Sequence, residues 1–411
     1  MNSAVKQPGV FSIPVIVGAL GFFVDVYDLL LFAIIRKPSL ASLGLSPDEV
    51  LSKGELIISV QMIGLLAGGI IWGILGDKKG RLSVLFGSII LYSLANIANG
   101  MVQNVTQYTW LRLIAGIGLA GELGASITLV SEMLPKEKRG LAASVIACAG
   151  VCGSVAAYFV YQGFGDWRLC YYIGGVMGFL LLFLRANVME SGLYQQVKKE
   201  GVPRGNFLML FARRERAWRY AKGVLIGLPV WYVIGLLITF SDKFGLEMGI
   251  QGIDPGKAVM YQYVALAFGD VSAGLLSNYL RSRRKAWFSF FFIMCVFVVL
   301  YFLQGTGWGT AQTMYLICAG LGFGAGTSVL YITMSAEQFG TNLRASTAIS
   351  IPNVVRGMLP LIILLHKGMR NLSGSYITGG WLTGILVLSL ALYAAFHINE
   401  TFAKDMDFVE A

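Results

Sequence analysis

The sequence is dominated by apolar runs that are long enough to cross a membrane. A spanning helix needs about 20 predominantly apolar residues, and twelve runs of roughly this length can be placed along the 411 residues. A chain with 56% hydrophobic and only 13% charged residues could not hide this much apolar surface in a soluble core. We therefore predict an all-α membrane protein. The predicted spans are 13–35, 55–75, 82–102, 107–132, 140–162, 169–185, 221–241, 259–280, 286–304, 311–335, 346–366 and 376–397.

The basic residues are unevenly distributed between the ends of these runs. The net charge is +10, which could indicate a nucleic-acid partner, so the positions of the 32 Lys and Arg residues decide the matter. If both termini are cytoplasmic, most of these residues lie on the cytoplasmic side, many of them between Arg185 and Lys222. This is the positive-inside bias, so the charge reports orientation. We expect a protein of a bacterial inner membrane, embedded in lipid, with cytoplasmic termini and no nucleic-acid partner.

The first apolar run and the cysteines give no sign of processing or of a metal site. The run is too long for a signal-peptide core and carries Asp25 and Asp28, so we expect it to remain as the first helix. The five cysteines lie in or beside apolar runs, and we interpret them as small buried hydrophobes. We expect no metal and no cofactor.

A short charged loop joins the second and third runs, with the sequence Gly-Ile-Leu-Gly-Asp-Lys-Lys-Gly-Arg from Gly73 to Arg81. Its glycines allow two helices to reverse tightly, and Asp77 and Arg81 place opposite charges at helix ends. The loop resembles the one between helices 2 and 3 of major facilitator transporters. The major facilitator fold, with twelve transmembrane helices in two pseudo-symmetric six-helix bundles, agrees with the number of runs.

The chain divides into two halves at a polar, basic segment. We predict an N-terminal bundle at 1–185, a cytoplasmic linker at 186–220 and a C-terminal bundle at 221–411. The segment from Leu113 to Gly118 recurs in outline from Leu316 to Gly322. Such parallel repeats are expected when two bundles rock about a central site.

The charged ends of the repeats predict a cytoplasmic gate. In each half an acidic residue precedes an arginine by seven positions. The counterpart of the Gly73–Arg81 loop is eroded in the second half, because Asn278 stands where Asp77 would be. A plain basic anchor is the favoured interpretation there, and we expect a stronger gate in the first half. The predicted gate residues are Gly73, Asp77, Arg81, Glu132, Arg139, Glu337 and Arg344.

Ionisable residues inside the spans are candidates for function, because each costs several kcal/mol to bury. Asp25 and Asp28 lie on one face of the first helix, so they cannot easily both stay ionised, and at least one should bind a proton near neutral pH. Arg112 is the natural counter-charge, and Glu122 follows it about 15 Å along the helix. An arginine lowers the proton affinity of a nearby acid and restores it on parting, which would couple a proton to a conformational cycle. A static ion pair between Asp28 and Arg112 is the alternative.

The segment from Arg112 to Gly140 and the pair Tyr27-Asp28 resemble the metabolite/proton and phosphate/proton symporters of the superfamily. Those families carry a Gly-Glu or Gly-Asp pair at the place of Gly121-Glu122. Sugar porters share the helix 1 aspartate and the helix 4 arginine, and the resemblance implies that Asp28 and Arg112 are the proton-coupling pair. The chain lacks the helix 7 glutamines of sugar porters, the helix 7 acid of phosphate porters and the helix 5 Gly-Pro of drug antiporters. Neither hexose nor phosphate is therefore favoured, and uptake is favoured over export.

Arg356 is the sharpest substrate-binding candidate of the second half. It lies near Asn353 between two prolines, which can free backbone carbonyls to face a cavity. A buried guanidinium with no acid beside it in sequence suits a carboxylate or phosphate group. A pair with Asp270 is an equal alternative. Further candidates for the cavity wall, each of which could instead be a packing residue, are Tyr158, Gln162, Trp231 and Tyr232.

We predict a monomeric secondary active transporter that takes up a small anionic or zwitterionic metabolite, an organic acid or amino acid, together with a proton. The alternatives are a proton-independent facilitator or an exporter, including one for a cation or metal. From a different class, a non-transporting membrane nutrient receptor remains open. An enzyme is not expected, because the sequence has no catalytic or cofactor motif.

Overall fold

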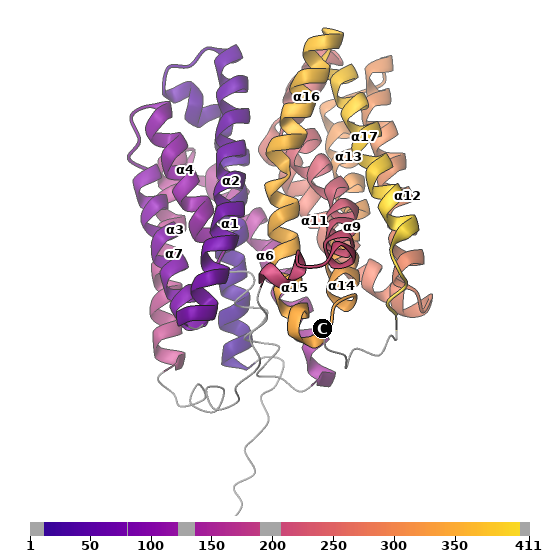
Figure 1. The fold of residues 1–411 in the computed structure, drawn as a ribbon. Helices are drawn as coiled ribbons and strands as arrows, with labels where there is room; N and C mark the ends of the chain where they lie inside the picture. Colours follow the sequence, from indigo (N-terminus) through magenta and orange to yellow (C-terminus); the bar gives the residue numbers. More distant parts are fainter. Residues whose placement is uncertain (1–11, 80, 122–135, 190–206, 403–411) are drawn as a thin grey trace, which may run out of the picture.

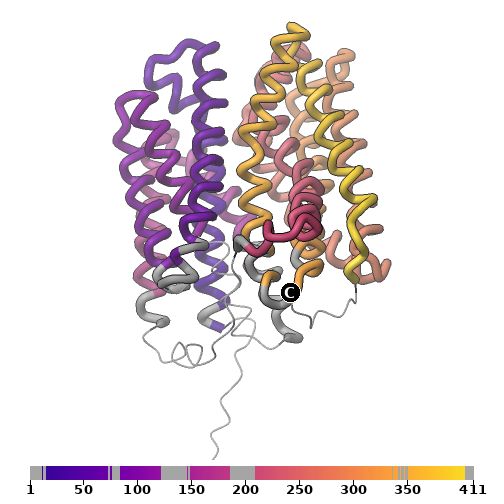
Figure 2. The backbone as a smooth tube through the Cα atoms, in the orientation of Figure 1, coloured from indigo at the N-terminus to yellow at the C-terminus, as the bar shows by residue number. Residues whose placement is uncertain are grey.

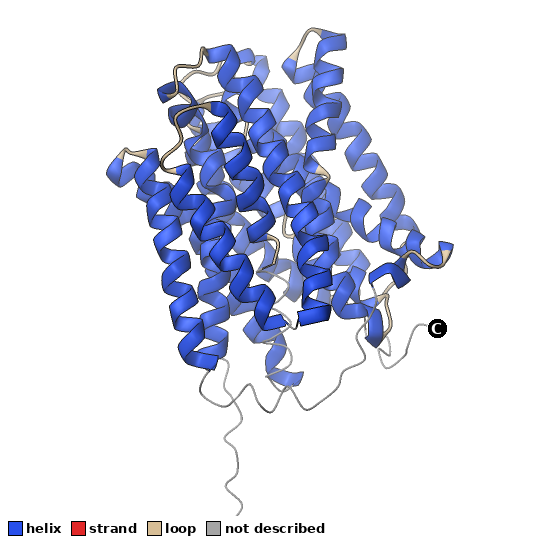
Figure 3. Ribbon diagram, turned by 60° about the vertical axis from the view of Figure 1, so that its left-hand side comes forward, coloured by secondary structure: helices blue, strands red, loops and turns tan. Residues whose placement is uncertain are grey.

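The computed structural model describes residues 12–79, 81–121, 136–189 and 207–402, and every regular element in these ranges is a helix (Figures 1 and 3). Two short elements, η1 and η3, are 3₁₀ helices, and η2 is a π-helix. The elements are α1 (Ile13–Ser42), α2 (Pro47–Lys79), α3 (Arg81–Asn99), α4 (Val105–Leu119), α6 (Lys136–Phe164), α7 (Trp167–Met189), η1 (Phe207–Leu210), α9 (Arg214–Trp231), η2 (Tyr232–Ile238), α10 (Ser241–Glu247), α11 (Pro255–Tyr279), α12 (Arg283–Leu303), η3 (Gln304–Thr306), α13 (Ala311–Gly324), α14 (Thr327–Glu337), α15 (Thr341–Gly357), α16 (Leu359–Ser373) and α17 (Tyr376–His397).

Eight helical stretches within the described residues are long and apolar enough to cross a membrane. The prediction of an all-α membrane protein agrees with this finding, while the count of twelve spans is not established by it. Three predicted runs are interrupted: 221–241 changes from α9 to the π-helix η2, 311–335 breaks between α13 and α14, and 346–366 breaks between α15 and α16. The predicted run 107–132 is described only as far as Gly121.

The helices of the first and second parts of the chain gather on opposite sides of the molecule. In Figure 1, α1 to α4 and α7 lie on the left, and α12, α13, α16 and α17 lie on the right. The chain trace in Figure 2 shows the same arrangement. Contacts between the two sides are made mainly by α6 with α11 and by α2 with α15 and α16. We call the first side, up to α7, the first half, and the second side, from α9 onward, the second half.

Close glycine contacts repeat between the halves. A Cβ atom on Gly116 of α4 would lie 2.2 Å from the carbonyl oxygen of Gln61 on α2. In the second half, a Cβ atom on Gly322 of α13 would lie 2.1 Å from the carbonyl oxygen of Gln262 on α11. Each glycine thus lets two helix backbones approach to a distance that no other residue allows. Both glycines lie within the repeated segments, although at different positions of the repeat.

Candidate functional site

The first half holds a fully buried ion pair between α1 and α4. The Nη1 atom of Arg112 lies 3.2 Å from Oδ1 of Asp28, and both side chains are 0% exposed. The Nη2 atom of Arg112 also donates to the Asp28 carbonyl oxygen at 3.1 Å. A buried pair of this kind is costly unless its remaining polar atoms are satisfied. The helix packing therefore brings together the two residues predicted as the proton-coupling pair.

One side of this ion pair is left unsatisfied. Oδ2 of Asp28 and Nε of Arg112 are buried and make no hydrogen bond within the described residues. The amide of Asn96 on α3 lies near the Asp28 carboxylate, but neither atom of that amide reaches hydrogen-bonding geometry. Asp25, one turn before Asp28, is 1% exposed. Glu122 lies outside the described residues.

The second half holds two charges that do not pair with each other. Arg356 on α15 is half-buried, and its guanidinium carbon lies 6.0 Å from the ring centre of Trp231 on α9. Within the described residues this guanidinium makes no ion pair or hydrogen bond. Asp270 on α11 instead accepts a hydrogen bond from Ser328 at 2.6 Å. The two charges nevertheless lie in the same region, since Arg356 and Asp270 are both close enough to Tyr331 to act on it electrostatically.

A small cavity lies between the halves beside Trp231. Its volume is about 20 Å³, which is room for roughly one water molecule. Its wall is apolar except for Gln61 and Thr239, and it includes part of the π-helix η2. A π-helical turn inside a longer helix is often found at functional sites. The lining residues are Leu29, Leu30, Ala33, Ile58, Gln61, Met62, Trp231, Ile234, Gly235, Thr239 and Leu359.

The remaining predicted cavity residues lie in different places. Tyr232 points away from the cavity, because its hydroxyl donates to the carbonyl oxygen of Gly380 on α17 at 2.9 Å. Asn353 lies at the contact between the halves, where its amide donates to the Ala120 carbonyl oxygen at 3.5 Å. Tyr158 and Gln162 on α6 both face the start of α11, and Gln162 donates to Asp254 at 3.5 Å. Of these residues, only Trp231 is beside Arg356 and the cavity.

Three ion pairs join the halves at the end of the bundle that is predicted to face outward, which we call the outer end. Arg36 of α1 contacts Asp242 of α10 at 2.7 Å, and Lys37 contacts the same carboxylate at 3.0 Å. Glu55 of α2 contacts Arg370 of α16 at 3.1 Å. Arg36 is 0% exposed and Glu55 is 5% exposed. These pairs were not predicted from the sequence, although the charges at the ends of the apolar runs were a signal for them.

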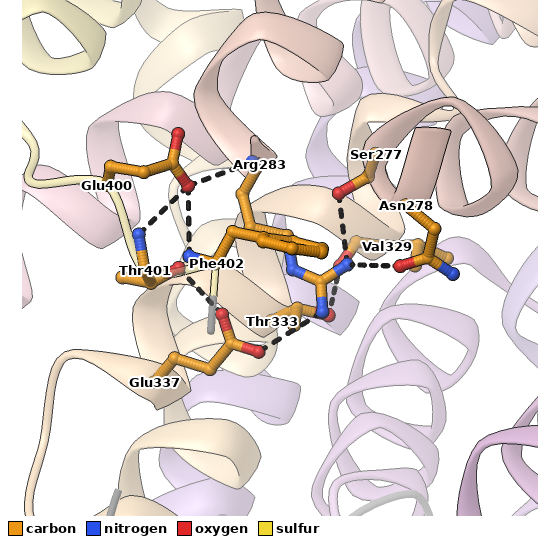
Figure 4. Close-up of polar contacts among 9 residues, drawn as sticks. All are labelled: Ser277, Asn278, Arg283, Val329, Thr333, Glu337, Glu400, Thr401 and Phe402. Carbon is orange, nitrogen blue, oxygen red and sulfur yellow. Dashed lines mark hydrogen bonds and ion pairs between the residues drawn. The ribbon is translucent and has the colours of Figure 1, made fainter. Parts of the chain in front are cut away.

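A second group of charges lies at the opposite, inner end, entirely within the second half (Figure 4). Arg283 at the start of α12 contacts Glu337 at the end of α14 at 3.4 Å. It also donates to Ser277 at 3.0 Å and to Asn278 at 3.5 Å. Thr401 donates to the other Glu337 oxygen at 2.6 Å. Arg283 is thus more than the plain basic anchor favoured from the sequence, because it ties α11 and α14 together.

Of the predicted gate, only Glu337 has a described side chain. Glu132 lies outside the described residues, and for the other five positions the structure gives the backbone alone. These five are Gly73, Asp77, Arg81, Arg139 and Arg344. The pairing of Glu337 that the structure shows is therefore with Arg283 and Thr401.

Glu400 holds the segment that follows α17 against this group of charges. Its carboxylate accepts hydrogen bonds from the Ser282 hydroxyl and from the backbone amides of Arg283 and Arg284. Burial acts to raise the pKa of Glu400, but these hydrogen bonds outweigh burial and hold the pKa below its usual value. A carboxylate at the first turn of α12 also complements the helix dipole.

The chain is similar to known proteins of one family. The Major Facilitator Superfamily profile matches residues 17–364. The niacin transporter NiaP of Acinetobacter baylyi is 27% identical over 362 residues, covering 79% of this chain and 80% of that protein. The 3-(3-hydroxy-phenyl)propionate transporter of Escherichia coli is 25% identical over 369 residues, covering 87% and 89%.

The fold is similar to that of solved transporters. A crystal structure of a D-xylose-proton symporter superposes with a TM-score of 0.68 at 16% sequence identity, covering 95% of this chain and 98% of the symporter. At this identity the likeness concerns the fold alone. Together with the buried charges and the apolar helices, the family match shows that this chain belongs to the Major Facilitator Superfamily and is a membrane transporter, not an enzyme.

Proposed function

We propose that the protein takes up a small aromatic carboxylate together with a proton. The observation that carries this proposal is the Arg356 guanidinium, which lies over the Trp231 ring and has no hydrogen bond within the described residues. An arginine with free donors suits a carboxylate, and a neighbouring indole and apolar wall suit a flat ring. The two relatives described above are named for niacin and for 3-(3-hydroxy-phenyl)propionate, and each of these compounds carries a carboxyl group and an aromatic ring.

Asp28 is the proposed proton carrier. In the charged state it forms the pair with Arg112. Protonation removes the negative charge, weakens that pair and frees α1 to move relative to α4. When Arg112 approaches the acid again, the proton is released. Arg112 acts through this change of proton affinity, and Asp25 and Glu122 remain proposed extensions of the relay.

Alternating access is the proposed cycle. The bodies that move are the bundles 1–185 and 221–411, which together contain the twelve proposed spans, and the cytoplasmic linker 186–220 joins them. The outer ion pairs Arg36–Asp242 and Glu55–Arg370 hold the bundles together at one end. They must break for substrate to enter from outside, and the gate at the inner end must open for release. We further propose a bacterial inner-membrane location, cytoplasmic termini and a monomer.

The test is uptake by reconstituted vesicles under an imposed proton gradient. Radiolabelled nicotinate and 3-(3-hydroxyphenyl)propionate are the probes, with acetate as a carboxylate that lacks a ring. Arg356→Gln should lower uptake of both aromatic acids about 10- to 100-fold at concentrations below saturation. Tyr232→Phe, which changes a hydroxyl facing α17, is the matched control. Full uptake by Arg356→Gln would overturn the assignment of the anion site. Equal transport of acetate would overturn the aromatic preference.

A further inference from the structure

A row of buried hydroxyls lies between the Asp28–Arg112 pair and the outer end of the first half. The hydroxyl oxygens of Tyr108 on α4 and Tyr171 on α7 are 2.7 Å apart, and both side chains are 0% exposed. The Tyr108 hydroxyl also lies 3.4 Å from Oγ of Ser39 on α1. Three helices therefore each contribute one hydroxyl to a continuous contact. Hydroxyls both donate and accept, so such a contact can pass a proton in either direction.

At its outer side the row is separated from the surface by the side chain of Trp167. The Trp167 ring stacks on Tyr108 with a centre-to-centre distance of 5.8 Å and an interplanar angle of 22°. Its indole N–H donates to the hydroxyl of Ser42 at 2.9 Å, and Ser42 is exposed. Tyr108 belongs to the first turn of α4, and Trp167 is the first residue of α7. The row thus begins where both helices meet the outer end.

The inner side of the row reaches the ion pair. The guanidinium carbon of Arg112 lies 5.5 Å from the ring centre of Tyr171. Arg112 and Asp28 are also the charged groups that act electrostatically on the two tyrosines. Tyr27 of α1 and Cys170 of α7 are further titratable side chains near this pair, and the Tyr27 hydroxyl donates to the Cys170 carbonyl oxygen at 2.9 Å. Arg168 of α7 lies at the outer side of the row, with its guanidinium carbon 4.3 Å from the Trp167 ring centre. Oδ2 of Asp28 makes no hydrogen bond within the described residues.

We propose that Tyr108 and Tyr171 conduct protons between the outer end and Asp28, along a route inside the first half that is separate from the path of the substrate. A proton from outside water is accepted at the Ser39 end of the row. Each hydroxyl oxygen then accepts one proton and releases the proton that it already carried, so the number of protons on each oxygen is unchanged. A water molecule bridges the last step from Tyr171 to Oδ2 of Asp28, where the new O–H bond forms. The inference rests on the proposed role of Asp28.

A separate route explains how Asp28 can exchange protons while the outer end is closed. Asp28 is 0% exposed, and the wall of the cavity between the halves is mainly apolar. The ion pair Arg36–Asp242 closes the space between the halves above that cavity. The hydroxyl row bypasses this closure, because it runs between α1, α4 and α7 alone.

Infrared spectroscopy after a rapid drop in external pH tests the route without a substrate. Vesicles carry the protein with its outer end facing the bath, and the protonated-carboxyl band that disappears in Asp28→Asn reports protonation of Asp28. Tyr171→Phe and Tyr108→Phe should each slow the appearance of this band roughly 100-fold, the size expected when a proton-transfer group is removed. Tyr27→Phe removes a buried tyrosine hydroxyl at the same helix contact but outside the row, and should leave the rate within about twofold of the wild type.

The outcomes separate this inference from the proposed function. A band that depends on Asp28 and appears at the wild-type rate in both row variants would overturn the route and leave the proton carrier standing. Equal slowing in Tyr27→Phe would overturn it as well, since the effect would then be structural. The absence of any band that depends on Asp28 would overturn the proposed proton carrier itself, and the route with it.

Discussion

The two halves treat their buried charges differently. In the first half, Asp28 and Arg112 form an ion pair with 0% exposure on both sides. In the second half, Arg356 is half-buried beside an aromatic ring, and Asp270 bonds to a serine. A charge that already has a partner is set for switching, because a proton can break the pair. A charge without one is set for binding, because a ligand can supply the partner.

This difference predicts opposite effects on stability and on transport. Removing one member of a buried pair strands the other, which costs roughly 3–5 kcal/mol. Removing an unpaired charge strands nothing.

Asp28→Asn should eliminate accumulation against a gradient and also destabilise the protein. Uphill uptake should fall roughly 100-fold or more, as expected when a proton-transfer group is lost, and the unpaired Arg112 should lower the free energy of unfolding by roughly 3–5 kcal/mol. Gradient-driven uptake and thermal unfolding in detergent measure the two effects. The double variant Asp28→Asn/Arg112→Met should regain stability but not accumulation. Retained accumulation in the single variant would remove Asp28 from the coupling role.

Arg356→Gln should show the reverse pattern. Loss of a charge-assisted hydrogen bond to the carboxylate costs roughly 1.5–3 kcal/mol, or about 10- to 100-fold in affinity. Thermal stability should change little, because no partner within the described residues is left behind. Nicotinate binding by calorimetry and an unfolding curve without ligand measure these quantities. A marked loss of stability would show that Arg356 has a structural partner and would weaken the contrast between the halves.

Asp242→Asn tests the pairs that lie between the halves. Arg36 would lose its carboxylate in a fully buried position, which should favour an open outer end by at least about 2 kcal/mol, or more than tenfold in population. Spin labels on cysteines placed at the exposed positions Ser46 and Thr378, in a background without other cysteines, should report a longer distance. Lys53→Gln removes an exposed charge on α2 and serves as the control. An unchanged distance distribution would show that Arg36–Asp242 does not govern closure.

Glu400→Gln should have the smallest effect. The pKa of Glu400 is lowered in the folded protein, so its contribution to stability is present above the unfolded-state pKa of about 4.3 and disappears as pH falls through the folded-state pKa. At neutral pH the substitution should cost about 1 kcal/mol or less, because the side chain is largely exposed. Unfolding curves of both proteins should therefore converge in acid. A difference that persists well below about pH 4, the usual range of carboxylate titration, would contradict the assigned cause.

The sequence predicted the features that depend on local pattern. Apolar length located the helices, and the spacing of Asp25 and Asp28 together with the position of Arg112 singled out the ion pair of the first half. Of the two neighbouring residues predicted for the cavity wall, Trp231 and Tyr232, the structure places only Trp231 beside the cavity. Neighbours on a helix point about 100° apart, so only Trp231 lies beside Arg356 while Tyr232 meets α17.

The contacts between the halves could not be predicted in the same way. Arg36 and Asp242 are 206 residues apart, and Glu55 and Arg370 are 315 apart. Hydrophobic periodicity reports which face of a helix is buried, but it does not report which distant helix covers that face. The hydroxyl row could not be predicted for the same reason, since Ser39, Tyr108 and Tyr171 meet only when three helices pack.

The outer ion pairs can form only after both partners have been synthesised, so closure of the outer end is delayed during translation. At about 5–20 residues per second, Arg36 waits roughly 10 to 40 s for Asp242 to be made. Glu55 waits longer for Arg370, because 315 residues separate the two. During that interval the insertion machinery or water at the membrane surface must hold both charges. A nascent first half can therefore be inserted and packed, yet its outer end is closed only after Asp242 and Arg370 of the second half have been made.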